Sequence, residues 1–269
     1  MRLHFTKMQG LGNDYIYFDC IRRPAPSDPE RLSITLSDRH FGIGGDGIVM
    51  IMPSDHADFR MRMFNADGSE GAMCGNASRC IAKYVYDRGL TDKKTVTLET
   101  LSGIKTLDIH TKSGVAESVT VDMGSPEVGV VKGNISTLHG NYTYTFVDMG
   151  NPHCVIFTNE PVDSLELEKI GRPLETHELF PYRANIEFVN IIDDKNLRMR
   201  VWERGSGETL ACGTGACAVV TAAAANGISP VNEDISVHLK GGVLTIRYTG
   251  ENVLMTGAAE FSFDGEIEV

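Results

Sequence analysis

The second half of this chain repeats the first half at a constant offset. Cys74 and Cys212 stand in two versions of one phrase, Glu70-Gly-Ala-Met-Cys74-Gly75 and Glu208-Thr-Leu-Ala-Cys212-Gly213, 138 positions apart. The same 138 positions separate two further pairs of similar segments, Phe59-Arg-Met-Arg-Met-Phe64 from Leu197-Arg-Met-Arg-Val-Trp202 and Gly12-Asn13 from Gly150-Asn151. The duplication predicts two similar halves, with two like thiols facing one another across a pseudo-twofold axis.

Length and offset together predict two domains. The chain has 269 residues, and a domain usually takes roughly 100 to 200. The last segment, 260–269, falls beyond the second copy, so we expect it to pair back onto the first domain. The predicted N-terminal domain is therefore 1–119 plus 258–269, and the predicted C-terminal domain is 120–257. Each half is long enough to bury its own core.

Alternation of apolar and polar residues predicts half-buried β-strands. The clearest segments are 59–64, 96–99, 104–110, 142–147, 197–202 and 243–248. We expect mostly antiparallel sheet, because these strands follow one another without helical crossovers.

Helical periodicity is clearest directly after each repeated cysteine. Apolar residues recur at helical spacing from Ala77 and stop at Gly89, and 216–226 is almost wholly small and apolar, with Gly227 as its stop. Shorter helices are predicted at 29–38 and 164–170. The predicted class is α+β: two pseudo-symmetric domains, each a curved, barrel-like antiparallel sheet around a central helix that has Cys74 or Cys212 at its N-terminal end.

Composition limits the partners. The formal net charge of −11 repels polyanions, and no basic patch stands out, so neither nucleic acid nor an anionic membrane is an expected partner. The chain begins without an apolar signal core and has no apolar run near the ~20 residues that span a bilayer, so we expect a cytoplasmic protein. Its thiols should then stay reduced, and four of the six cysteines are interpreted as small buried hydrophobes, Cys20, Cys80, Cys154 and Cys217.

Two thiols at helix N-termini permit proton transfer on both faces of one carbon. The positive helix end lowers the pKa of a cysteine below its usual ~8.5 and attracts a carboxylate. Backbone N–H groups at Gly75-Asn76 and Gly213-Thr214 could cradle one substrate carboxylate, while one thiolate removes the α-proton and the opposite thiol returns one. This pattern predicts an amino-acid racemase or epimerase with one S⁻ and one S–H at rest, and a bell-shaped pH–rate curve.

The residues leave other interpretations open. The paired thiols could form a disulfide in an oxidised, inactive form, or serve a redox-sensitive dithiol binding protein. A zinc site is disfavoured by the cysteine spacing, and pyridoxal-phosphate chemistry lacks a suitable lysine because Lys83 should be a solvated charge. The glycine-rich run 42–47 favours a turn over a phosphate loop. Taken singly, the histidine, asparagine and charged residues of the other motifs favour structural roles.

Read together and in order, five motifs resemble those of the diaminopimelate epimerase family. They are Gly10-Leu-Gly-Asn13-Asp14, Phe64-Asn65-Ala-Asp67-Gly-Ser-Glu70, Met73-Cys74-Gly75-Asn76, Gly150-Asn151-Pro152-His153-Cys154, and Glu203-Arg204-Gly-Ser-Gly-Glu208-Thr-Leu-Ala-Cys212-Gly213-Thr214-Gly215. They run from residue 10 to residue 217, and the segments at both ends are compatible, so the resemblance covers nearly the whole chain. It implies a cofactor-independent enzyme, without a metal, that interconverts LL- and meso-diaminopimelate in lysine and peptidoglycan precursor biosynthesis, and it makes a homodimer an expectation.

The resemblance also implies roles for individual residues. Cys74 and Cys212 match the two acid/base thiols, and His153 and Glu203 match supporting catalytic residues. Residues matching the substrate ligands are Asn13, Asn65, Gly75, Asn76, Asn151, Asn185, Glu203, Arg204, Gly213 and Thr214. Arg204 would select a second carboxylate.

The chain departs from the family pattern at two places. Many members have a glutamine where Gly47 stands, and Ala77-Ser78 replaces a more usual glycine-containing pair. The nearest rival is a proline racemase or hydroxyproline epimerase of the same fold. Those enzymes have a sequence like Cys-Gly-His where this chain has Cys74-Gly75-Asn76.

Overall fold

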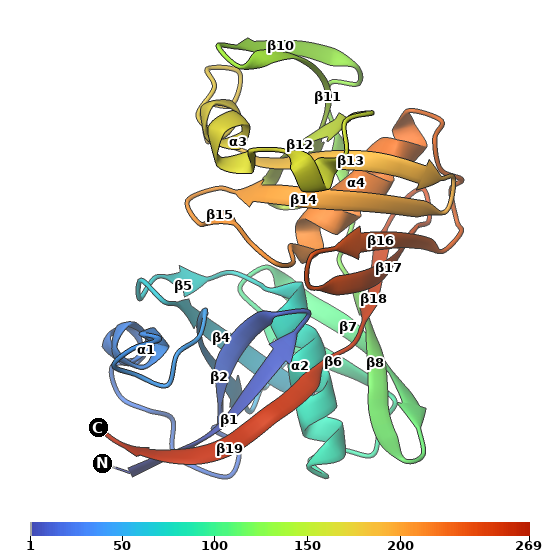
Figure 1. Cartoon of the computed structure of the whole chain (residues 1–269). Coiled ribbons are helices and arrows are strands. Elements are labelled where there is room, and N and C mark those ends of the chain that lie inside the picture. Colours follow the sequence, from blue (N-terminus) through green and yellow to red (C-terminus); the bar gives the residue numbers. More distant parts are fainter. Residues whose placement is uncertain (1) are drawn as a thin grey trace. The chain divides into compact units, whose positions relative to one another are not determined.

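The computed structural model describes residues 2–269, which form two compact units (Figure 1). One unit runs up to Val121 and takes in Gly257–Val269, and the other is Asp122–Thr256. Each unit is built of β-strands with two α-helices, and each has a core of its own.

The first unit is one mixed sheet in the order β19-β1-β2-β3-β4-β6-β7-β8, with the short β5 on the end of β4. Its strands are β1 (Arg2–Gly10), β2 (Asn13–Asp19), β3 (Gly47–Met52), β4 (Phe59–Asn65), β5 (Glu70–Gly71), β6 (Thr95–Thr100), β7 (Gly103–Lys112), β8 (Val115–Asp122) and β19 (Glu260–Glu268). The C-terminal strand β19 pairs antiparallel with β1, which confirms that the last segment returns to the first half.

The second unit has a sheet in the order β10-β11-β12-β13-β14-β16-β17-β18, with β9 on β11 and β15 on β14. Its strands are β9 (Glu127–Val128), β10 (Gly133–Thr137), β11 (Gly140–Asp148), β12 (Pro152–Phe157), β13 (Asn185–Asp193), β14 (Asn196–Glu203), β15 (Gly207–Glu208), β16 (Ile235–Leu239), β17 (Gly242–Tyr248) and β18 (Val253–Gly257).

The sequence offset reappears in the elements and in their register. Helix α1 (Pro29–Ser37) and helix α3 (Leu167–Glu175) coincide after a shift of 138, and so do α2 (Gly75–Asp87) and α4 (Gly213–Ala225). In the parallel pair β2–β3, Tyr15 lies opposite Gly47, and in β12–β13, His153 lies opposite Asn185, again 138 positions on. The predicted α+β class with two similar halves is confirmed.

The predicted strands are confirmed, but the expectation of no helical crossovers was wrong. All six alternating segments lie inside strands, and most pairs are antiparallel. Four pairs are parallel, however, with one α-helix between the members of each: β2–β3 with α1, β4–β6 with α2, β12–β13 with α3, and β14–β16 with α4. Parallel neighbours require a crossover connection, and each of these helices lies in one.

The two helices after the repeated cysteines are confirmed. Gly89 and Gly227 follow them with φ of 66° and 69°, which suits the left-handed stop of a helix. The helix predicted at 164–170 was misplaced: a short 3-10 turn covers Val162–Ser164, and α3 begins at Leu167 and continues to Glu175. It passes through Pro173, which removes only one backbone donor near the end of a short helix.

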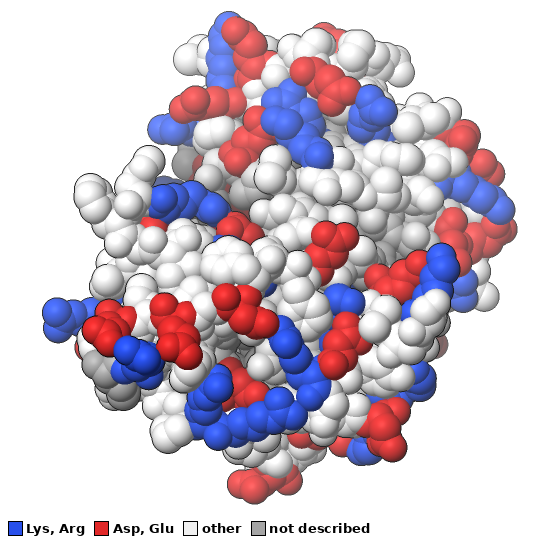
Figure 2. Space-filling model, turned by 60° about the horizontal axis from the view of Figure 1, so that its bottom comes forward, with Lys and Arg blue, Asp and Glu red and all other residues white. Residues whose placement is uncertain are grey.

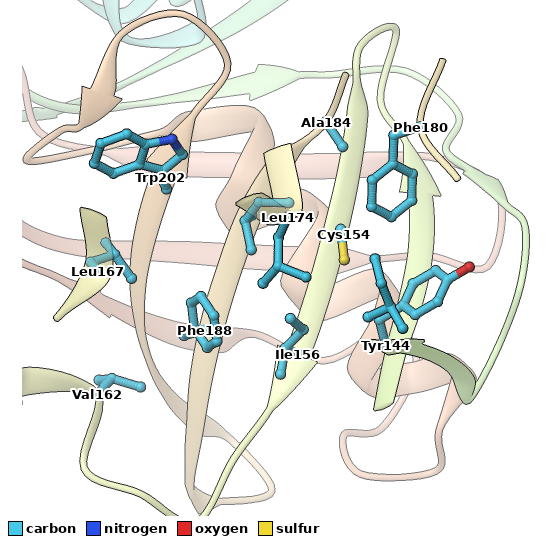
Figure 3. Packing of buried hydrophobic residues seen from close by; sticks show 12 residues of the cluster. Tyr144, Cys154, Ile156, Val162, Leu167, Leu174, Phe180, Ala184, Phe188 and Trp202 are labelled. Atoms are coloured by element: carbon cyan, nitrogen blue, oxygen red, sulfur yellow. The ribbon is translucent and has the colours of Figure 1, made fainter. Parts of the chain in front are cut away.

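The core of the second unit packs under α3. Figure 3 shows Trp202, Leu174 and Phe188 among its members, with Phe180 and Tyr144 on another side of the cluster. The rings of Tyr144 and Phe180 meet edge to face, with centroids 5.7 Å apart. Each fully buried side chain of this size contributes roughly 1.5–3 kcal/mol by leaving water, so the unit has its own source of stability.

Helices α2 and α4 are both mostly buried. Cys80, Cys154 and Cys217 are buried as predicted, and Cys20 is only half-buried. The interpretation of Lys83 as a solvated charge was wrong. Its ammonium pairs with Asp87 at 2.8 Å and donates to the backbone of Ala116, because β8 covers that side of the helix.

Acidic and basic side chains are interspersed on the face of the molecule drawn in Figure 2, and no extended basic area appears on it. Among residues 2–269, none of the helices combines the length and the apolar composition needed to cross a bilayer.

Candidate active site

Cys74 is the N-cap of α2. Its sulfur accepts a hydrogen bond from Ala77 N at 3.5 Å, and its thiol donates to Asn13 Oδ1 at the same distance. The first N–H groups of a helix have no acceptor within the helix, so Gly75 and Asn76 present theirs at the helix end next to this sulfur. The glycine after the cysteine leaves that end open to a ligand.

Asn13 links this thiol to a partly exposed network of charges. Its amide nitrogen donates to Asp46 Oδ2 at 2.7 Å, and the backbone N–H of Asp14 donates to the same oxygen at 3.0 Å. Burial raises the pKa of Asp46, and the charge of Asp14 adds to the effect. Arg39 pairs with both carboxylates, at 2.7 Å to Asp14 and 3.0 Å to Asp46.

The buried phenol of Tyr17 and the thiol of Cys80 form a second group beside Cys74. Burial raises the pKa of Tyr17, and the neighbouring thiols of Cys80 and Cys74 raise it further. Burial likewise raises the pKa of Cys80 to about 11. Both groups therefore stay protonated at neutral pH.

Cys212 is the N-cap of α4, the position that matches Cys74. Its sulfur accepts from Gly215 N at 3.3 Å and lies 3.6 Å from the hydroxyl of Thr214. The residue is 6% exposed. Gly213 and Thr214 are the first residues of the helix, so their N–H groups lie at its open end.

Glu203 ends β14 beside this second thiol. Its carboxylate accepts a short hydrogen bond from the hydroxyl of Thr209. Burial raises the pKa of Glu203; Thr209 and the nearby His153 and Cys212 oppose that effect, and the charge of Glu187 adds to it. A carboxyl with a raised pKa can give or take a proton closer to neutral pH.

The expected lowering of the cysteine pKa does not hold at Cys212. Burial raises its pKa well above the usual value, and the negative charges of Glu203 and Glu187 raise it further. The hydrogen bonds from Thr214 and from Gly215 N act in the opposite direction and are outweighed. Loss of hydration disfavours a thiolate more strongly than the helix end favours it.

His153 belongs to a hydrogen-bonded chain that ends at Cys212. Its Nδ1 lies 2.6 Å from Glu187 Oε1, with both side chains fully buried, and its Nε2 lies 3.1 Å from Asn151 Oδ1. Asn151 then donates to Thr214 Oγ1 at 3.3 Å, and Thr214 contacts the sulfur. The histidine thus reaches the thiol through two intervening side chains.

Asn185 and Arg204 are joined to each other. The side chain of Asn185 accepts from Arg204 N at 2.9 Å and donates to Pro152 O at 3.0 Å, so it ties the start of β12 to the turn after β14. The exposed guanidinium of Arg204 donates to Tyr182 O at 3.0 Å. In the first unit, Asn65 donates to Ser69 Oγ at 3.0 Å.

The backbone around Gly47 leaves no room for a side chain. Its φ is 155°, and a Cβ there would lie 2.0 Å from Phe64 O. A glutamine could not take this place without moving the strands. The run 42–47 also turns as predicted, with Gly44 N bonded to Leu36 O at 2.9 Å.

Most of the predicted site residues gather around one thiol or the other. Cys74 has Asn13, Gly75 and Asn76 near it, while Cys212 has a larger group: His153, Glu203, Asn151, Gly213 and Thr214. Sequence reasoning missed Glu187, Thr209 and Tyr17. The repeat contains a signal for Glu187, because the offset of 138 aligns this glutamate with the apolar Val49 of the first copy. Both positions are buried, so the glutamate stands where the repeat predicts a core residue.

None of the six cysteines, all of which lie within the described residues, forms a disulfide. Across the described residues, 2–269, no group of three or more histidine, cysteine or acidic side chains is arranged to hold a metal ion.

Comparison with known proteins agrees with these features. A family model described as diaminopimelate epimerase matches residues 5–129 and 145–262. A diaminopimelate epimerase from Phocaeicola vulgatus is 52% identical over 281 residues, covering 99% of each chain. One from Methanococcus maripaludis strain S2 is 50% identical over 281 residues, covering 99% of this chain and 100% of the relative.

Solved structures share the fold at low identity. A PhzF-family phenazine biosynthesis protein from Bacillus anthracis has a TM-score of 0.77 at 15% identity, covering 100% of both chains. A hydroxyproline epimerase from Agrobacterium vitis has a TM-score of 0.73 at 16% identity, covering 99% of this chain and 92% of the other. The family model and the relatives at about half identity over the full length establish that this chain belongs to the diaminopimelate epimerase family.

Proposed function

We propose that this enzyme interconverts LL- and meso-diaminopimelate, with Cys74 and Cys212 as the two acid/base groups. The observation that carries the proposal is the duplicated thiol, which is the N-cap of α2 in one unit and of α4 in the other. Two equivalent thiols suit a reaction that removes a proton from one face of a carbon and returns one to the other face.

The reaction balances on two thiols alone. The thiolate takes the α-proton of the substrate and becomes a thiol, and the other thiol gives its proton to the opposite face and becomes the thiolate. The carbanion that forms between the two steps places charge on the α-carboxylate. N–H groups of Gly75, Asn76, Gly213 and Thr214 lie at helix ends, where negative charge is stabilised.

His153 and Glu203 are proposed to assist the proton transfers at Cys212. Glu203 lies beside the thiol, and His153 reaches it through Asn151 and Thr214. Both residues belong to the second unit, so the assistance is not symmetric.

The remaining polar residues are proposed to bind the substrate. Asn13 and Asn151 lie next to the two thiol sites, and the exposed Arg204 has further N–H groups for a distal carboxylate. Asn65 and Asn185 are proposed ligands as well. Asn185 already binds two backbone groups, so its contribution includes holding Arg204 in place.

We further propose a cytoplasmic, cofactor-independent homodimer whose two functional domains are 1–119 with 258–269 and 120–257. The physiological role proposed is lysine and peptidoglycan precursor biosynthesis. Sedimentation velocity on the purified chain tests the dimer directly.

Purified, reduced protein dialysed against a chelator and given LL-diaminopimelate tests the activity. Formation of the meso isomer is expected. L-Proline and trans-4-hydroxy-L-proline serve as controls, because solved structures of the same fold include a hydroxyproline epimerase. Turnover of L-proline in place of diaminopimelate would replace this proposal with the rival one.

A further inference from the structure

Glu187 is a carboxylate buried in the second unit that the proposed mechanism does not use. It lies on β13, between Ile186 and Phe188, and is fully buried. One oxygen, Oε1, lies 2.6 Å from His153 Nδ1, and the other, Oε2, is buried with no hydrogen-bond partner. Burying a carboxylate oxygen without a hydrogen-bond partner costs folding free energy, so the position of Glu187 calls for an explanation.

The carboxylate approaches Cys212 because residue 215 has no side chain. A Cβ placed on Gly215 would be 2.8 Å from Glu187 Oε1 and 3.2 Å from Cys212 Sγ. The carboxylate oxygen and the sulfur therefore both lie close to the position that a side chain on residue 215 would occupy. Any larger residue there would push them apart.

The first unit has no counterpart to this carboxylate. The residue 138 positions before Glu187 is Val49, on β3, which is fully buried and apolar. The residue that matches Glu203 is Asn65. The carboxylates of Glu187 and Glu203 are therefore present at only one of the two duplicated thiol sites.

We propose that Glu187 is a positioning residue that keeps the proton on Cys212 in the resting enzyme. The proposal rests on the proposed function in one respect: it takes Cys212 as the thiol of the catalytic pair that is protonated in the resting enzyme. The charge acts directly, through the gap at Gly215, since a nearby negative charge disfavours a second one. The charge of Glu187 is among the causes that raise the pKa of Cys212, after burial and Glu203.

The other ionisable groups around Cys212 are Glu203 on β14 and His153 on β12. Glu203 acts in the same direction as Glu187. His153 faces two acceptors, the carboxylate and Asn151 Oδ1, and a ring with both nitrogens protonated satisfies both. Its charge would partly offset that of Glu187, so the proposal requires the nearer carboxylate to dominate at the sulfur.

The test is the pH dependence of alkylation at Cys212, because the thiolate is the reactive form. Wild type and Glu187→Gln are treated with iodoacetamide from about pH 6 to pH 10, and modification is followed at each cysteine by mass spectrometry. At neutral pH, Cys212 in E187Q should react about tenfold faster, the change expected for an acidity shift of one unit. Cys74 in the same molecule should keep its rate.

Two further variants separate charge from structure. Glu187→Asp retains the charge and should stay close to wild type. Glu175→Gln removes another buried carboxylate of the same unit, one bonded to Trp202 and Gly205, and should leave the alkylation of Cys212 unchanged.

An unchanged or slower reaction at Cys212 in E187Q would overturn the proposal, since His153 would then cancel the carboxylate. An equal rise in E187Q and E187D would also overturn it, because it would point to loosened packing. No substrate is used in these measurements. A failure of the proposed epimerase activity would therefore leave the alkylation result standing, and the two failures can be told apart.

Discussion

Cys212 and Cys74 occupy the same position in the repeat, yet their surroundings differ. Cys212 lies near two carboxylates, the partly buried Glu203 and the fully buried Glu187, which together with burial raise its pKa. Cys74 donates to an amide oxygen of Asn13 and lies beside the phenol of Tyr17. The two thiols are therefore unequal before any substrate is bound, as a mechanism with one thiolate and one thiol requires.

Replacing either thiol should abolish epimerisation. In Cys74→Ala or Cys212→Ala one face of the α-carbon has no proton donor or acceptor, so the rate should fall by at least the ~100- to 10,000-fold that one general acid or base provides. Conversion of LL- to meso-diaminopimelate measures this. Circular dichroism should show a near-native fold in both variants, and an active, folded single variant would contradict the two-thiol mechanism.

Glu203→Gln should make the protein more stable at neutral pH and less active. Burial raises the pKa of Glu203 in the folded state, so the folded protein holds this proton more tightly than the unfolded chain does. That advantage is present below the unfolded pKa of ~4.3 and is lost as pH rises through the raised folded pKa.

The measurement is thermal unfolding of wild type and E203Q at pH 4 and at pH 8. The melting temperature of E203Q should exceed that of wild type at pH 8, and the gap should narrow at pH 4. Turnover should drop ~100-fold or more. A variant that is less stable at pH 8 would show that the ionised carboxylate is stabilised in the fold.

At the scale of elements, the repeated glutamate ahead of each cysteine has a structural role. Glu70 binds Arg62 through two hydrogen bonds of 2.7 and 3.0 Å, and Glu208 binds Arg200 through two of 2.8 and 3.1 Å. Each pair joins a long strand to the short strand that leads to the cysteine. The repetition of the motif thus reflects the support of the loop as well as the chemistry of the thiol.

Glu208→Gln should cost about 1.5–3 kcal/mol of folding stability, the range for a hydrogen bond to a charged group. Arg200 is only 9% exposed, so it would lose its counter-ion while buried. Arg200 holds the pKa of Glu208 below its usual range, so the contribution exists above the unfolded pKa of ~4.3 and fades as pH falls below it.

Urea denaturation of wild type and E208Q at pH 7 and at about pH 3.5 checks this prediction. The difference in unfolding free energy should be clear at pH 7 and small in acid. Glu70→Gln is the matched variant in the other unit and should cost less, since Arg62 is more exposed than Arg200. Equal losses at both pH values would rule out the ion pair as the cause.

The capping role of the sulfurs predicts that serine replaces cysteine better than alanine does. Each sulfur accepts a backbone N–H at a helix start, from Ala77 or from Gly215, and a serine hydroxyl can do the same. Loss of an N-cap costs about 0.5–2 kcal/mol. Cys74→Ser should therefore melt above Cys74→Ala while sharing its loss of activity, and a reversed order would show that the sulfur does not cap α2.

The sequence predicted those elements whose pattern is local. Alternation located the half-buried strands, and the small-residue run 216–226 located the buried helix α4. It could not detect the parallel pairing of β12 with β13, because the two strands are joined through the crossover helix α3 and not by a local turn. The same limit applies to the site. Repeated motifs identified the two thiols, whereas Glu187 approaches Cys212 only through a tertiary contact at Gly215, which no local pattern reveals.

At the scale of the whole chain, the first unit is completed by a strand from the far end of the sequence. β19 pairs with β1 from Arg2 to Gln9, and its Phe261 ring lies 4.7 Å from the guanidinium of Arg88. In the second unit the equivalent place is taken by the local strand β10. The first unit therefore cannot complete its sheet until the whole chain has been made.

Deletion of residues 260–269 should unfold the first unit and spare the second. The second unit keeps its own core, and the single tryptophan of the chain, Trp202, lies in it. Tryptophan fluorescence should then still report a cooperative transition, while far-ultraviolet circular dichroism shows a loss of β-structure. Removal of Val269 alone is the control, and a truncated chain with full β-content would contradict the prediction.

The central claim is that two thiols exchange protons with one α-carbon, and isotope incorporation tests it most directly. Reduced protein is incubated with LL-diaminopimelate in deuterated water, and the Cα–deuterium content of the meso product is measured at early times. Because the donating thiol exchanges its proton with the solvent, every molecule of meso product formed should carry deuterium at the inverted carbon. Meso product without deuterium, or no exchange at all in wild type, would contradict it.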